Sequence, residues 1–208
     1  MKALFKHSLF VVASALILGL STGSAFAEVK VTAEKPTFDD LQSPEFPGGK
    51  QKPFKPKFWL EIETKVKVVM APEPKTKTCD KLTIKWYVAV KNGEKPGTIL
   101  LFSKEVDHVN VPLNEDVYLS IYLSPASIKR ITGFDRAAKS SVEAVGFEIL
   151  VDGQRATADT TKWKVDWWDS PSEKISRSEV VPLLTKPQTA FNGMWWDRYA
   201  EVSSSSVR

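Results

Sequence analysis

FWLEIETKVKVVM, residues 58–70, decides the fold class of this chain of 208 residues. Every second residue from Phe58 to Met70 is apolar or threonine, and most of the residues between them carry a charge. A period of two is typical of a long β-strand with one buried face, because successive side chains of a strand point to opposite sides. The stretch therefore predicts a sheet rather than a helix.

The same alternation recurs towards the C-terminus, and Asn92-Gly93 and Asp152-Gly153 supply turns between the runs. The further strands are predicted at residues 82–90, 99–102, 106–111, 117–123, 142–151 and 156–168, with an edge strand at 178–185 because of Pro182. One short helix is expected between a capping Ser124 and Gly133.

These elements predict an all-β fold, an immunoglobulin-like antiparallel β-sandwich with one short helix, over residues 58–200. A closed barrel is the alternative architecture. The chain has a single cysteine, so the usual disulfide between the two sheets cannot form and core packing must provide the stability.

The N-terminus has the features of an export signal. Lys2 and Lys6 precede an apolar run at residues 9–20, and Ala25-Phe26-Ala27 forms an A-x-A cleavage site. The run is shorter than the roughly 20 residues that a membrane-spanning helix needs. We therefore predict a signal peptide at residues 1–27, no membrane span after its cleavage, and a location in the periplasm or at the cell surface.

Residues 28–57 are predicted to be a Pro-rich linker or an arm that reaches a partner. They hold five of the 13 prolines, which lack an N–H donor and disfavour helices and central strands. Residues 201–208 contain four consecutive serines and are predicted to be a disordered tail.

Charge and motif content exclude several classes of function. The formal net charge of +4 falls to +2 without the two lysines of the signal, so we expect no nucleic-acid partner. His108 is the one histidine after residue 27, and no phosphate-binding glycine loop or nucleophile elbow occurs. We expect no enzymatic activity, no metal and no cofactor. Glu61 and Glu63 would lie about 7 Å apart on one strand face, which we interpret as a solvated surface.

Five side chains are candidates for an interaction site. Cys79 lies among lysines, and it is either an intermolecular thiol or a small residue packed at the start of a strand. The other four form two adjacent pairs, Trp167-Trp168 and Trp195-Trp196. Because neighbours in a strand face opposite ways, one ring of each pair is expected at the surface, unless residues 192–199 fold back over the sandwich.

Four strings resemble a known family. Phe58-Trp-Leu-Glu-Ile-Glu63, His108-Val-Asn-Val-Pro112, Tyr122-Leu-Ser-Pro125 and Trp195-Trp-Asp-Arg-Tyr199 resemble the verrucomicrobial, Akkermansia-type family of pilus-like proteins with an immunoglobulin-like fold. The resemblance implies an exported sandwich in a pilus-like or surface assembly. The cleavage site follows the apolar run here, which argues against a pilin subunit that keeps this helix as a filament core.

Two functions are compatible with these features of the sequence. The leading one is an exported, non-enzymatic structural or interaction protein of a pilus-like or cell-surface assembly, with envelope proteins or a second copy as partners. The alternative is a carbohydrate-binding module or adhesin-like domain that binds glycans through exposed tryptophans.

Overall fold

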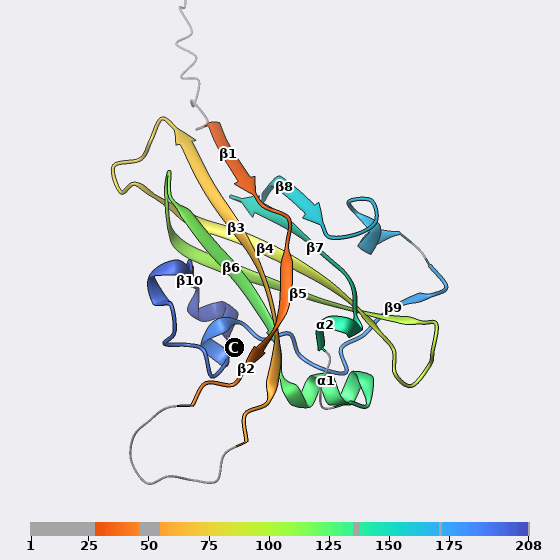
Figure 1. Ribbon diagram of the computed structural model, residues 1–208. Coiled ribbons are helices and arrows are strands. Elements are labelled where there is room, and N and C mark those ends of the chain that lie inside the picture. Colours follow the sequence, from red (N-terminus) through yellow and green to blue (C-terminus); the bar gives the residue numbers. More distant parts are fainter. Residues whose placement is uncertain (1–27, 46–54, 135–137, 171, 208) are drawn as a thin grey trace, which may run out of the picture.

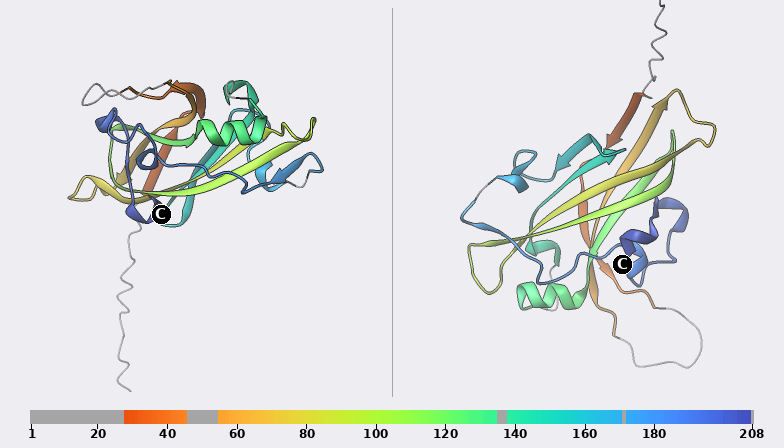
Figure 2. Two further views of the ribbon diagram at one scale, coloured as in Figure 1. Left: turned by 90° about the horizontal axis from the view of Figure 1, so that it is seen from below. Right: turned by 180° about the vertical axis from the view of Figure 1, so that it is seen from behind.

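The computed structural model describes residues 28–45, 55–134, 138–170 and 172–207 and confirms the predicted all-β sandwich with few helices. Two sheets pack face to face, and a short helix lies at one end of them (Figures 1 and 2). The predicted signal peptide at residues 1–27 and part of the predicted linker, residues 46–54, lie outside the described residues.

The smaller sheet is built around β3 (Phe58–Ala71), the strand formed by the opening stretch. β6 (Asp116–Leu123) pairs with one side of β3, while β1 (Glu28–Ala33) and β2 (Thr37–Gln42) pair in turn with the other. β1 and β2 form one edge strand that is interrupted by a bulge. At the break, the three residues 34–36 lie opposite only two residues of β3, 64 and 65.

The predicted linker is therefore wrong for residues 28–42. Val29, Val31 and Phe38 pack against the core, and Pro36, which lacks an N–H, lies at the break between β1 and β2. A proline is tolerated at a bulge of an edge strand because one side of that strand has no ladder partner. Residues 28–42 are part of the smaller sheet and are therefore not free to act as an arm that reaches a neighbouring molecule.

The larger sheet has the order β10-β5-β4-β7-β8, with β9 paired in parallel to β5. Its strands are β4 (Thr78–Lys91), β5 (Ile99–Pro112), β7 (Val142–Val151), β8 (Gln154–Thr160), β9 (Ile175–Arg177) and β10 (Glu201–Val202). The two strands predicted at 99–102 and 106–111 are the single strand β5.

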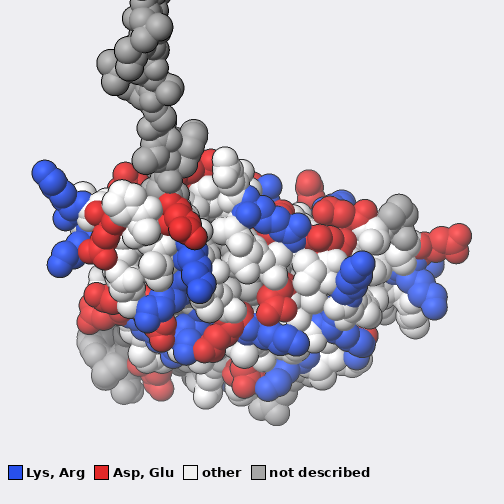
Figure 3. Space-filling model, turned by 90° about the horizontal axis from the view of Figure 1, so that it is seen from above, with Lys and Arg blue, Asp and Glu red and all other residues white. Residues whose placement is uncertain are grey.

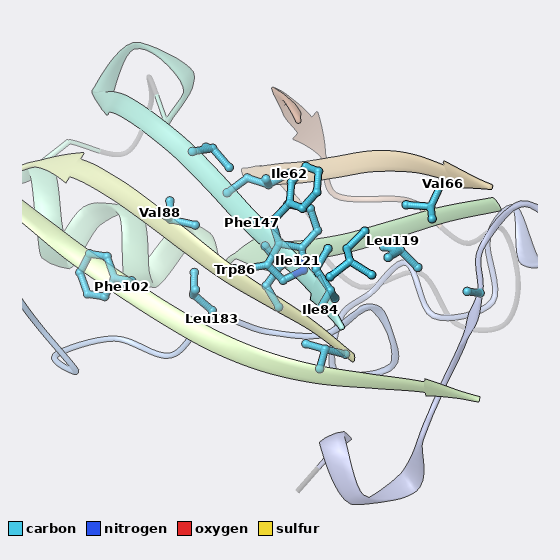
Figure 4. Close-up of a cluster of buried hydrophobic side chains, with 14 of the residues drawn as sticks. Ile62, Val66, Ile84, Trp86, Val88, Phe102, Leu119, Ile121, Phe147 and Leu183 are labelled. Carbon is cyan, nitrogen blue, oxygen red and sulfur yellow. The ribbon is translucent and has the colours of Figure 1, made fainter. Parts of the chain in front are cut away.

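The core between the sheets is aromatic at its centre (Figure 4). Trp86, Phe102 and Phe147 are each at most 1% exposed, and the rings of Trp86 and Phe147 meet edge to face at 5.8 Å. Burying such a side chain contributes about 1.5–3 kcal/mol relative to leaving it in water. Packing of this kind holds the two sheets together where a disulfide cannot.

The predicted helix is confirmed as α1 (Pro125–Thr132). The Ser124 side chain accepts a hydrogen bond from the backbone N–H of Ser127, and Gly133 ends the helix with φ of 78°. Glycine adopts this left-handed conformation without strain. A second helix of one turn, α2 (Ala138–Ser141), was not predicted.

Three predictions for the C-terminal third are wrong. β8 ends at Thr160, and the chain then forms the 3-10 helix η1 (Trp167–Asp169) in place of a strand to residue 168. Residues 178–185 contribute an isolated bridge rather than a strand. The predicted disordered tail forms β10 and η4 (Ser204–Val207), where the backbone N–H of Asp107 donates to the Ser206 hydroxyl at 2.9 Å.

Candidate interaction surface

Residues 184–202, here called the C-terminal strap, bind both sheets. Leu184 exchanges two backbone hydrogen bonds of 2.8 Å with Tyr122 of β6, and the N–H of Ala200 donates to the carbonyl of Tyr118. The strap then pairs with β5 of the larger sheet through β10. It therefore spans from one sheet to the other and covers the outer face of β3 and β6, where Tyr122 has no exposed surface.

A buried lysine organises the first half of the strap. Lys186 is 5% exposed, and its ammonium donates to the carbonyl oxygens of Phe191, Asn192 and Met194. These bonds occupy all three donors of the ammonium group. Burial lowers the pKa of Lys186. Phe191, fully buried, packs against Trp59 and Tyr122 with ring centroids 5.6 and 5.7 Å away.

The two carboxylates predicted to be a solvated face anchor the second half of the strap instead. The Tyr199 hydroxyl donates to Glu63 at 2.9 Å, and Arg198 donates to the same carboxylate at 2.7 Å. The Tyr122 hydroxyl donates to Glu61 at 2.8 Å. Desolvation raises the pKa of the Glu61 carboxyl. Sequence reasoning missed this contact because Arg198 and Tyr199 lie about 135 residues away along the chain.

Between these anchors the strap presents two tryptophans to solvent. Trp195 is 48% exposed and Trp196 is 65% exposed. Trp195 has φ of 51°, in the left-handed region, and it immediately precedes the 3-10 helix η3 (Trp196–Arg198). That conformation costs a residue with a Cβ about 1–2 kcal/mol, which the surrounding anchors offset. The strap therefore folds back as one sequence interpretation expected, while these rings stay at the surface.

The other predicted pair, Trp167-Trp168, is buried in the structure. The prediction that these two side chains belong to an interaction surface is therefore corrected. Trp167 and Trp168 are 7% and 3% exposed, because a 3-10 helix lets both rings turn towards the larger sheet. Trp168 stacks on Tyr87 with ring centroids 4.5 Å apart, and the Trp167 indole N–H donates to Thr160. Gly146, in the middle of β7, is the feature of the sequence that points to this burial. It has no side chain, which leaves room for the ring of Trp168.

The fifth candidate, Cys79, is also buried, and so is His108, the one histidine after residue 27. Cys79 is 2% exposed, its thiol donates to the carbonyl of Lys81, and burial raises its pKa. The interpretation as an intermolecular thiol is therefore wrong for the folded chain, and Cys79 packs as a small core residue. His108 is 1% exposed with Nδ1 3.3 Å from the carbonyl oxygen of Ala200, and burial lowers its pKa to about 4.

A cavity of about 200 Å³ lies under the strap. Its wall includes His108, Tyr118, Ser120, Trp196 and Tyr199, which come from β5, β6 and the strap. Glu61 and Glu63 do not line it. Among the described residues, no group of three or more His, Cys, Asp or Glu side chains could hold a metal ion. No helix in the described part of the chain is long and apolar enough to cross a membrane.

The two-sheet architecture defines an immunoglobulin-like β-sandwich protein, and its most exposed aromatic pair lies on the strap. A family model matches residues 22–206. The crystal structure of a protein from Akkermansia muciniphila matches with a TM-score of 0.79 and 37% sequence identity, covering 85% of this chain and 94% of that one.

The chain therefore belongs to the verrucomicrobial, Akkermansia-type family of pilus-like proteins with an immunoglobulin-like fold. A comparison with curated proteins finds no match. The family is of a structural, pilus-like type and is not a known family of enzymes, and membership supports a role at the cell surface or in a pilus-like structure.

Proposed function

We propose that the protein is an exported, non-enzymatic component of a pilus-like or cell-surface assembly, which binds a protein partner of the envelope or a second copy of itself. The observation that carries this proposal is the exposed pair Trp195-Trp196 on a strap that is anchored at both ends. Tryptophan is among the residues most enriched at the energetic centres of protein interfaces.

Charge supports a specific contact rather than general adhesion to a charged polymer. On the face shown in Figure 3, basic and acidic side chains are interspersed and neither sign forms a continuous field. The exposed indole pair itself offers shape and apolar contact, and its rigid rings bind with little loss of conformational entropy.

The test is the location and assembly of the variant Trp195→Ala in the native cell. Surface filaments are sheared off, and the sheared, outer-membrane and soluble fractions are blotted for the protein. A central interface tryptophan contributes about 2 kcal/mol or more, equivalent to about 30-fold in affinity. We expect the variant to move from the sheared or membrane-bound material to the soluble fraction.

Trp163→Ala is the matched control, because Trp163 is similarly exposed, at 40%, but lies outside the strap. This control should keep the native distribution. Retention of Trp195→Ala in the assembled material at the native level would contradict the proposed surface.

A further inference from the structure

Two Asn-Gly pairs of the chain are held differently by the fold. Asn92-Gly93 directly follows β4, and Asn192-Gly193 lies in the strap. In an Asn-Gly pair the backbone nitrogen of the glycine can reach the side-chain carbonyl carbon of the asparagine with little hindrance, because glycine has no Cβ and the widest backbone freedom. Both pairs have this local chemistry, so a difference in their reactivity has to come from the structure.

The first pair is restrained by hydrogen bonds on both reacting groups. The N–H of Gly93 donates to the carbonyl of Ile131 at 3.0 Å. Oδ1 of Asn92 accepts from the N–H groups of Glu94 and Lys95 at 3.0 and 3.3 Å. An attack needs the nitrogen and the carbon about 3–3.5 Å apart in the right orientation. Reaching that geometry requires these hydrogen bonds to open, which costs free energy.

The second pair lacks these restraints. Asn192 and Gly193 are exposed, and neither the Asn192 side chain nor the Gly193 N–H has a hydrogen bond within the described part of the chain. A Cβ added at Gly193 would meet nothing within 4 Å, so the backbone is open there. The backbone carbonyl oxygen of Asn192 accepts from the Lys186 ammonium at 3.3 Å. A cation on this oxygen draws electron density from the peptide group and favours loss of the proton from the Gly193 nitrogen.

We propose that Asn192 is a site of spontaneous deamidation in the folded protein, whereas the fold protects Asn92. The Gly193 nitrogen loses its proton to water and forms a bond to Cγ of Asn192. The Cγ–Nδ2 bond breaks, and Nδ2 takes up a proton and leaves as ammonia. Water then adds to one carbonyl of the cyclic imide and breaks its bond to the nitrogen, which gives aspartate or isoaspartate. The reaction consumes one water and releases one ammonia, and nothing is oxidised or reduced.

The modification would alter the anchor of the strap. Either product adds one negative charge at residue 192, and isoaspartate also adds a backbone atom before Gly193. Lys186 donates to carbonyls on both sides of this bond, those of Phe191 and Met194. With a longer backbone between these carbonyls, the hydrogen bonds of the lysine cannot all keep their present geometry. The strap would therefore exist in two chemical states, and this inference does not depend on the assembly role proposed above.

The test follows both asparagines in one sample of the mature chain, kept folded at mildly alkaline pH and physiological temperature. Trypsin cleaves after Lys91 and after Arg177, so the two sites lie in different peptides. Mass spectrometry measures the deamidated fraction of each peptide over time, with a digest of unaged protein as the background. We expect Asn192 to convert at least about tenfold faster than Asn92, the factor expected if even one hydrogen bond must open at Asn92. Equal rates, or faster conversion at Asn92, overturn the proposal.

The same measurement in guanidinium chloride separates the effect of the fold from that of local sequence. The unfolded chain has lost the restraints on Asn92, so the two rates should converge; an undiminished difference would assign it to local sequence and overturn the proposal. The variant Gly193→Ala tests the nucleophile in the folded chain, because its methyl group hinders the nitrogen but clashes with nothing. Conversion of Asn192 should slow severalfold in this variant while that of Asn92 stays unchanged. An unaltered rate at Asn192 would contradict attack by the Gly193 nitrogen.

Discussion

Gly146→Ala should destabilise the protein although alanine is the better residue in most strands. Replacing a strand glycine normally stabilises by about 0.5–1 kcal/mol, because glycine loses more backbone entropy on folding. At Gly146 an added Cβ would lie 2.3 Å from Cζ3 and 2.7 Å from Cε3 of Trp168. Carbon atoms in contact normally lie about 3.5–4.0 Å apart, so the indole must retreat by more than 1 Å.

That retreat is opposed by the packing of the ring. Trp168 is stacked on Tyr87 at 4.5 Å with an interplanar angle of 6°, and it meets Trp167 edge to face. Overpacking of this kind costs about 1–3 kcal/mol, which outweighs the gain in backbone entropy. We expect a net loss of about 1–2 kcal/mol in the free energy of unfolding.

Urea denaturation followed by tryptophan fluorescence measures this loss, with near-UV circular dichroism to report the displaced stack. Gly193→Ala is the control, because an added Cβ there meets nothing within 4 Å, and its midpoint should stay within about 0.5 kcal/mol of native. In a Trp168→Ala background, Gly146→Ala should no longer destabilise, since the clashing ring is gone. A Gly146→Ala midpoint equal to or above the native one would refute the reasoning.

Three further outcomes follow from buried polar groups. Lys186→Met should cost about 2–4 kcal/mol by leaving carbonyls of the strap without their donor, and hydrogen exchange should rise first in residues 186–194; unchanged exchange there would contradict the anchor. Cys79 should react with a thiol reagent only upon unfolding, so rapid labelling of the native chain would show that it is accessible. His108 titrates near 4 when folded and near 6.5 when unfolded, so the unfolded state binds the proton more tightly between these values. Stability should therefore fall by about 3 kcal/mol from pH 7 to pH 4, and His108→Gln should remove this part of the dependence in urea titrations.

The sequence predicts those elements whose pattern is local. Alternation in β3 and the capping pair Ser124 and Gly133 are visible within 14 residues, and the structure confirms both. β1 and β2 also alternate, but five prolines in residues 28–57 outweighed this signal. Only Pro36 lies within the strands' span, and a bulge accommodates it.

The candidate site depends on long-range contacts, which no local pattern reveals. One tryptophan pair is exposed, Trp195-Trp196, and the other is buried, Trp167-Trp168. The difference depends on how the 3-10 turn of each pair lies against the sheets. The assumption that adjacent tryptophans alternate across a strand fails for both pairs because neither is in a strand. The binding of Glu63 by Tyr199 and the cavity beside it depend on the path of the strap, which propensity does not determine.

The strap also has a consequence for the order of events during folding. It joins β6 of one sheet to β5 of the other through residues that follow both strands in the sequence. Synthesis proceeds from the N-terminus, so β1, β3 and β6 exist before the segment that covers them. The two sheets can be fastened together in this way only after the strap has been added, and until then the chain lacks the contacts of the strap with both sheets.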